Sequence, residues 1–207
     1  MVIKEFTPEN KYIHIPVHGR NPRGEGYYYV EIYAGGEKRT EIYIAVTPPE
    51  EPFDFYVPFK ADRYGTESIT LICRDENAPE NLFDGIKLGG KLFDEPELYP
   101  DLYKEEIRQQ LHFSPARGWT NDANGLFYKD GKFNLYFQHA PFGNLHNGTN
   151  ISWGHAVTTD GVHYKEYDDA ILALDRFIQL HPGNRNIAYA YGMAFGITEE
   201  EKALYQE

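Results

Sequence analysis

Apolar and polar side chains alternate in several short runs between residues 11 and 75. Neighbouring side chains on a β-strand point to opposite faces, so a period of two predicts strands with one buried face. Turn-forming pairs such as Asn21-Pro22 and Gly35-Gly36 stand between the runs. The runs cover residues 12–17, 27–33, 40–46, 53–57 and 68–72. Short strands separated by turn signals predict a small antiparallel β-sandwich over residues 1–75.

The alternation fades between residues 76 and 110, where prolines, glycines and acidic residues are frequent. We interpret this stretch as a linker that packs against both neighbouring parts of the chain. Within it, residues 101–108 have an acidic start and carry Leu102, Tyr103 and Ile107 on one side. That pattern predicts a short helix leading into the next domain.

A second set of strands is predicted after residue 125. Asp130-Gly131 is a two-residue hairpin signal between two apolar runs. The expected strands are residues 126–128, 133–137, 151–158, 162–167 and 171–174. The last two, 162–167 and 171–174, would complete a four-stranded sheet. The predicted fold class is all-β.

Residues 111–125 combine aromatic residues, turn formers and one carboxylate, Asp122. The run 121–125 consists of residues that tolerate left-handed and turn conformations. We therefore place Asp122 at the mouth of the hairpin, outside its strands. A turn-capping aspartate is the alternative interpretation, and spacing alone does not exclude it.

The charge balance narrows the possible partners. The formal net charge is −12, with 32 acidic residues against 20 Lys and Arg. Phosphate binding requires a basic surface, so neither nucleic acid nor an anionic membrane is an expected partner. Seventeen Tyr and thirteen Phe favour β-rich structure, because aromatic rings suit half-buried pleated surfaces. A neutral ligand fits this composition better.

A single cysteine, Cys73, excludes an intrachain disulfide and is expected to be a buried thiol. The first residues lack the unbroken apolar core of a secretory signal. No run approaches the roughly 18 apolar residues of a membrane helix. These features predict a cytoplasmic protein.

Four short motifs follow one another in the second half of the chain. They are His112-Phe113-Ser114-Pro115, Gly118-Trp119-x-Asn121-Asp122-x-Asn124-Gly125, Tyr136-Phe137-Gln138-His139 and Trp153-Gly154-His155-Ala156. In order and spacing they resemble the opening motifs of glycoside hydrolase family 32. That family comprises invertases, levanases, inulinases and related β-fructosidases. The resemblance runs from about residue 110 to residue 174.

The resemblance implies a five-bladed β-propeller with its site on the central axis. It implies Asp122 as the nucleophile, and Asn121 and Gln138 as residues that bind the fructosyl ring of sucrose or a fructan. Trp119 and Trp153 are candidates for either the pocket wall or the core. His146 lies in a loop where the family usually has a pocket tryptophan. No cofactor and no metal is expected, and the motif histidines are read as hydrogen-bonded structural residues.

Retaining hydrolysis of a fructofuranosyl bond needs two carboxyl groups roughly 5 Å apart. Asp122 can supply one of them. The family places the acid/base Glu and a further Asp in later blades, and the residues from 111 onward have room for two blades at most, at roughly 40 to 50 residues each. We therefore expect residues 111–174 to form the first one to two blades of a propeller in a truncated, inactive polypeptide.

An incomplete propeller leaves open strand edges, so self-association is expected. After residue 174 the predicted tail, 175–207, is divergent and partly helical, with a capping box at 198–201. The alternative to a β-fructosidase is a non-catalytic carbohydrate-binding or structural β-protein. The motifs do not choose between sucrose, levan and inulin.

Overall fold

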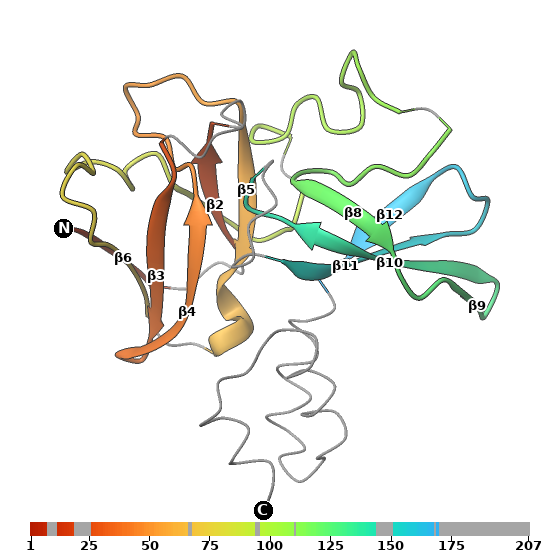
Figure 1. Cartoon of the computed structure of the whole chain (residues 1–207), viewed down its shortest axis with the longest axis horizontal. Coiled ribbons are helices and arrows are strands. Elements are labelled where there is room, and N and C mark those ends of the chain that lie inside the picture. The colour runs from red at the N-terminus through yellow and green to blue at the C-terminus, as the bar shows by residue number, and fades with distance from the viewer. Residues whose placement is uncertain are drawn as a thin grey trace, which may run out of the picture.

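The computed structural model describes residues 1–7, 12–18, 26–65, 68–93, 96–109, 111–143, 151–167 and 169. In these residues the chain is all-β, as predicted, and η1 (Ala61–Tyr64) is a single turn of 3-10 helix (Figure 1). The strands are β1 (Val2–Phe6), β2 (Tyr12–Val17), β3 (Tyr28–Ala34), β4 (Glu37–Ile44), β5 (Phe55–Lys60), β6 (Ile69–Cys73), β7 (Lys87–Gly89), β8 (Trp119–Ala123), β9 (Phe127–Lys129), β10 (Lys132–Ala140), β11 (Ser152–Thr158) and β12 (Tyr164–Tyr167). No helix in the described ranges is long and apolar enough to cross a bilayer.

The first part of the chain forms two antiparallel sheets, ordered β1-β6-β3-β4 and β5-β2-β7. Their inward side chains bury one common apolar cluster, to which β2, β3 and β6 all contribute. Cys73 lies in this cluster, and its thiol is buried as expected. We call these two sheets and their connections the first unit.

All six side chains of β2 are buried, and residues that follow β6 contribute to this burial. His14 shares a hydrogen bond of 2.6 Å with the hydroxyl of Tyr99. Leu82 and Phe83 enter the apolar cluster itself. Most of the stretch interpreted as a linker therefore packs onto the first unit.

The prediction of a short helix over residues 101–108 is wrong. This segment consists of turns, and Tyr103 has a left-handed backbone with φ 61°. A non-glycine residue with positive φ cannot continue a right-handed helix. The Tyr103 hydroxyl instead donates to the Glu166 carboxylate at 2.6 Å, so a tertiary contact outweighs the helical pattern.

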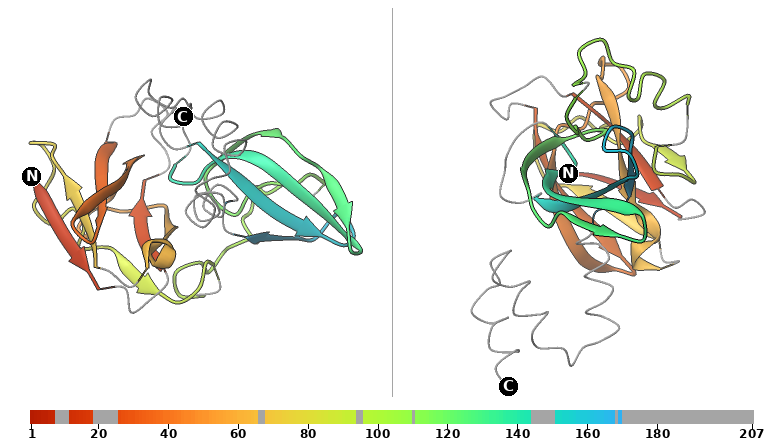
Figure 2. Two further views of the ribbon diagram at one scale, coloured as in Figure 1. Left: turned by 90° about the horizontal axis from the view of Figure 1, so that it is seen from below. Right: turned by 90° about the vertical axis from the view of Figure 1, so that its right-hand side faces the viewer.

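The five remaining strands form a sheet of their own, which we call the second sheet. It has the order β12-β11-β10-β8, and β9 pairs with the other half of β10. The predicted hairpin between β9 and β10 is confirmed, with positive φ at both Asp130 and Gly131. Figure 2 shows this sheet at the opposite end of the molecule from β1 and β6. The expected strand 171–174 and the predicted helical tail lie outside the described residues.

Candidate functional site

The strand that carries Asp122 contains a β-bulge. In β8 and β10, Ala123 lies opposite Phe137 and Thr120 opposite His139. Two residues of β8, Asn121 and Asp122, therefore face the single residue Gln138. A bulge of this kind interrupts the regular alternation of faces and re-aims the side chains next to it.

The prediction that Asp122 lies outside the strands is wrong. Asn121, Asp122 and Ala123 belong to β8, and Asp122 is not at a hairpin mouth. The bulge accommodates the extra residue, so pairing with β10 outweighs the turn preference of Asn and Asp.

Asn121 and Gln138 meet across the bulge. The Asn121 Nδ2 donates a hydrogen bond of 2.8 Å to the Gln138 Oε1. Each side-chain amide has a donor group and an acceptor oxygen, so this bond uses one group of each. Asn121 and Asp122 are solvent-exposed. The structure thus brings together three of the predicted site residues on one open part of the sheet.

Glycine and backbone hydrogen bonds hold both ends of β8 against β10. Gly118 has φ +83°, and a Cβ there would lie 2.4 Å from the carbonyl oxygen of Ala140. Any other residue at this position would be strained and would push the strands apart. After the strand, the Asn124 amide donates to the Tyr136 carbonyl at 2.7 Å. The position of Asp122 is therefore set from both sides.

Both predicted tryptophans lie near this group. Trp153 lies opposite Gln138 in the register of β10 and β11 and is partly buried. Its indole Nε1 is buried and has no hydrogen-bond partner among the described residues, which is unusual for a buried donor. Trp119 begins β8, opposite Ala140. His146 lies outside the described residues.

A buried histidine supports the other face of β10. His139 Nε2 donates to the carbonyl of Arg117 at 2.8 Å, and Nδ1 pairs with Asp169 at 3.1 Å. Ser152 also donates to Asp169. Burial disfavours the charged imidazole, but the Asp169 carboxylate and the two hydrogen bonds outweigh it and raise the pKa of His139. His139 is thus hydrogen-bonded on both ring nitrogens, which agrees with the structural interpretation.

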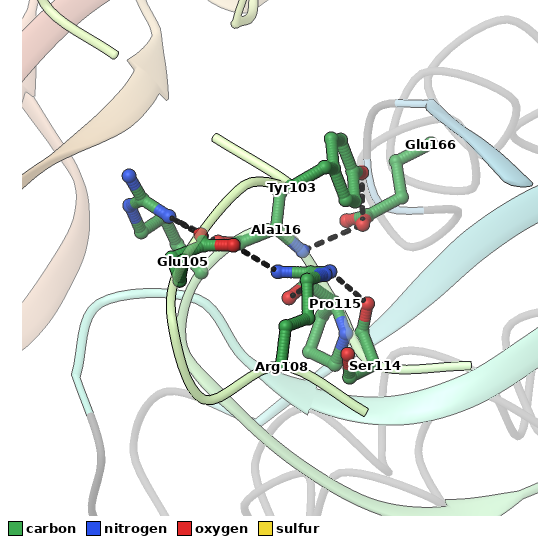
Figure 3. A network of polar contacts seen from close by, with 8 residues as sticks. Tyr103, Glu105, Arg108, Ser114, Pro115, Ala116 and Glu166 are labelled. Atoms are coloured by element: carbon green, nitrogen blue, oxygen red, sulfur yellow. Dashed lines mark hydrogen bonds and ion pairs between the residues drawn. The ribbon is translucent and has the colours of Figure 1, made fainter. Parts of the chain in front are cut away.

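Glu166 is a partly buried carboxyl group that the motifs did not indicate. It accepts hydrogen bonds of 2.6 Å from the Tyr103 hydroxyl and the Ala116 amide (Figure 3). Burial raises the pKa of Glu166, and burial and this carboxylate raise the pKa of Tyr103. The period-two pattern of β12 was the available signal, since it places Glu166 on the same inward side as Tyr164.

Known proteins match the part of the chain that holds this site. Residues 112–180 match the N-terminal domain of glycosyl hydrolases family 32. We call these residues the family 32 segment, after this match. The match extends past residue 174, where the sequence motifs alone placed its end.

The similarity to individual family 32 proteins covers the same region. An extracellular exo-inulinase of Aspergillus awamori is 48% identical over 71 residues, which are 34% of this chain and 13% of that protein. Invertase 1 of Saccharomyces cerevisiae is 38% identical over 84 residues, 40% of this chain and 16% of the invertase. The crystal structure of the Aspergillus awamori exo-inulinase shares 42% identity over 34% of this chain and 13% of its own, with a TM-score of 0.29. The chain thus spans a small part of these relatives.

Within the family 32 segment, the two partly buried acids Glu166 and Asp169 do not reach Asp122. Glu166 is on β12, three strand spacings from β8, which amounts to about 14 Å. Asp169 contacts His139, which points to the opposite face of β10 from Gln138. A retaining glycosidase needs its two carboxyl groups about 5 Å apart. The part of the chain that the structure describes contains no group of three or more His, Cys, Asp or Glu side chains that could hold a metal ion.

Proposed function

We propose that this chain carries the nucleophile and part of the fructosyl subsite of a retaining β-fructofuranosidase. The substrates would be terminal β-D-fructofuranosyl bonds of sucrose, levan or inulin. The observation that carries the proposal is the Asn121–Gln138 amide pair beside the exposed Asp122, across a bulge in a family 32 segment. Two of the similar proteins are named as an exo-inulinase and an invertase, and these names support the same substrate class.

The chemistry follows from the residue types. The Asp122 carboxylate would attack the anomeric carbon and form a fructosyl ester, while amides hold the ring hydroxyls through an oxocarbenium-like transition state. A carboxylic acid must protonate the leaving oxygen and later activate water. Within the described residues, neither Glu166 nor Asp169 reaches Asp122 for this role. We therefore include in the proposal that residues 1–207 alone are inactive.

The proposed architecture is a first domain folded as a β-sandwich and a second sheet that is a blade of a five-bladed propeller. The second sheet supports this because it is apolar on both faces near its hairpin. Leu135 and Phe137 point inward, whereas Phe127 stacks on Tyr136 on the other face, with ring centroids 6.0 Å apart. A sheet with two apolar faces is suited to a position between neighbours.

Fructose binding tests the proposal. The side-chain amide signals of Asn121 and Gln138 would be followed by NMR during titration with fructose, and with glucose as the control sugar. We expect saturable shifts with fructose that are lost in Gln138→Leu and kept in Gln109→Leu, an exposed glutamine elsewhere in the chain. Shifts of equal size with glucose would favour the alternative, a non-catalytic or structural β-protein.

Activity gives a second readout. The 207-residue chain is expected to release no fructose from sucrose or levan above the buffer background. Robust release that Asp122→Asn abolishes would support the fructosidase assignment and contradict the expected inactivity.

A further inference from the structure

Arg117 lies where the first unit meets the second sheet. Its side chain is 14% exposed, and its Nη1 donates to Glu105 Oε1 at 3.0 Å. The guanidinium carbon is 5.4 Å from the centroid of the Phe55 ring, which belongs to β5 of the first unit. An arginine cation over an aromatic face is attracted by the ring quadrupole, more strongly where water is excluded. The side chain of Arg117 is thus held from the first unit.

The main chain of Arg117 is held from the second sheet. Its carbonyl oxygen accepts the hydrogen bond from His139 Nε2, and the next residue, Gly118, fits closely against Ala140. Strand β8 begins immediately after that glycine. A displacement of Arg117 would therefore also move the start of β8, and with it Asn121 and Asp122 in the same strand.

The end of β10 is tied to the first unit in the same way. Phe142 packs on Phe59, with ring centroids 6.2 Å apart. A Cβ on Gly143 would lie 2.9 Å from the hydroxyl of Tyr27, so the backbone there touches the first unit directly. Both strands that form the bulge are thus anchored to the same neighbour at the same end of the sheet.

We propose that the first unit is a positioning element for the candidate nucleophile, and that it acts through Phe55 and Arg117. Phe55 and Glu105 fix the guanidinium, Arg117 fixes the entry of β8, and β8 fixes where Asn121 and Asp122 point. Arg117 is a positioning residue in this scheme and touches no substrate. The inference takes the role of Asp122 from the proposed function, but the geometric claim stands without it.

The experiment compares local with global effects in the full chain. Arg117→Met removes the guanidinium and keeps the length of the side chain, and Arg117→Lys keeps the charge. Arg39→Met is the matched control, because Arg39 is an arginine of β4 that pairs with Glu37. Val30→Ala is the second control, because it weakens the core of the first unit away from the junction.

The primary readout is the NMR shift of the Asn121 side-chain amide together with hydrogen exchange of the Asn124 amide. In Arg117→Met we expect exchange at Asn124 to be about fivefold faster and the Asn121 signal to move, with β11 amides unchanged. Arg117→Lys should recover part of both effects. In a double-mutant cycle, Phe55→Leu should add little to Arg117→Met, because both remove the same contact.

Two outcomes would overturn the inference. One is an unchanged Asn121 signal in Arg117→Met. The other is the same change in Val30→Ala, which would show a general loss of stability. Neither readout needs fructose, so a failure of the proposed function would leave this result interpretable. If fructose does bind, Arg117→Met should weaken its affinity while Arg39→Met does not.

Discussion

The two parts of the molecule differ in how far they bury their own apolar residues. In the described residues, the main cluster of the first unit contains twenty buried side chains, from Val2 to Ile86. The corresponding cluster of the second sheet contains three, Leu135, Phe137 and Ala156. Burial of apolar surface is the main stabilising term in folding, so the first unit has far more of it.

The second sheet also exposes aromatic side chains. Around its hairpin, Tyr128 is 63% exposed, Phe133 50% and Phe127 45%. The candidate site lies on this sheet, which buries few apolar side chains of its own. We infer that the site depends on contacts with the better-packed first unit. A loss of packing in the second sheet should therefore affect the site first, and leave the first unit folded.

The largest expected effect comes from Phe137→Ala. Phe137 is 2% exposed and packs against the ring of Phe113 at 4.8 Å, so truncation should cost about 3–5 kcal/mol. With so small a cluster, β10 to β12 should lose their protection against hydrogen exchange while β3 and β6 keep theirs. Phe133→Ala, on the same strand but half exposed, is the control and should change little. A simultaneous loss of protection in both parts would show that they unfold as one.

The second effect concerns pH and His139. A histidine with a raised pKa stabilises the fold below its ordinary pKa of about 6.5, and this contribution is lost as the pH rises through the higher folded value. Glu166, whose pKa is also raised, acts in the same direction. Burial lowers the pKa of His155, which acts in the opposite sense but only as the pH falls below its ordinary value.

The urea midpoint of the second sheet should therefore fall between pH 7 and pH 9. His139→Gln should lower the midpoint at pH 7 and flatten its pH dependence. His163→Gln, at an exposed histidine that pairs with Asp160, should leave the slope unchanged. A slope that survives in His139→Gln would assign the effect to another group.

The third expected effect, smaller than the first two, is a concentration-dependent self-association of the chain. The exposed rings of Tyr128 and Phe133 lie 4.8 Å apart on the projecting hairpin, and such surface favours association. Sedimentation velocity should show the average mass rising with concentration, and Tyr128→Thr with Phe133→Thr should reduce that rise. A monodisperse monomer at all concentrations would contradict the expectation.

The smallest effect on stability should come from Asn121→Ala. The side chain is exposed, so loss of its bond to Gln138 should cost about 0.5–1.5 kcal/mol at most. Fructose binding, in contrast, should be lost. A large loss of stability without a loss of binding would mean that this amide pair is structural.

The sequence allowed the regular parts of the fold to be predicted. Residues 12–17 coincide with β2, and the Asp130-Gly131 hairpin was recognised, because period-two patterns and turn residues are local signals. The failures come from long-range contacts. The bond from Tyr103 to Glu166 replaced a helix, and pairing with β10 made a strand of residues whose local preference is a turn.

The residues of the candidate site could be proposed from the sequence only through the motifs. Asp122, Asn121 and Gln138 stand out in those motifs, and the bulge that brings them together is a property of strand pairing. Glu166 and Arg117 have no motif of their own. Their roles depend on contacts with residues more than ten positions away, such as Ala116 to Glu166 and Phe55 to Arg117.

The most direct test of the account is covalent labelling by β-D-fructofuranosyl fluoride, followed by mass spectrometry of the peptide that contains Asp122. Fluoride leaves without acid assistance, so the Asp122 oxygen can bond to the anomeric carbon as the carbon–fluorine bond breaks and fluoride departs with the electron pair. We predict a mass gain of one fructosyl group that persists, because no second carboxyl of the described residues reaches Asp122 to activate water, and we predict its absence in Asp122→Asn. An unlabelled Asp122 under conditions where fructose binds, or equal labelling of the Asp122→Asn variant, would contradict the assignment.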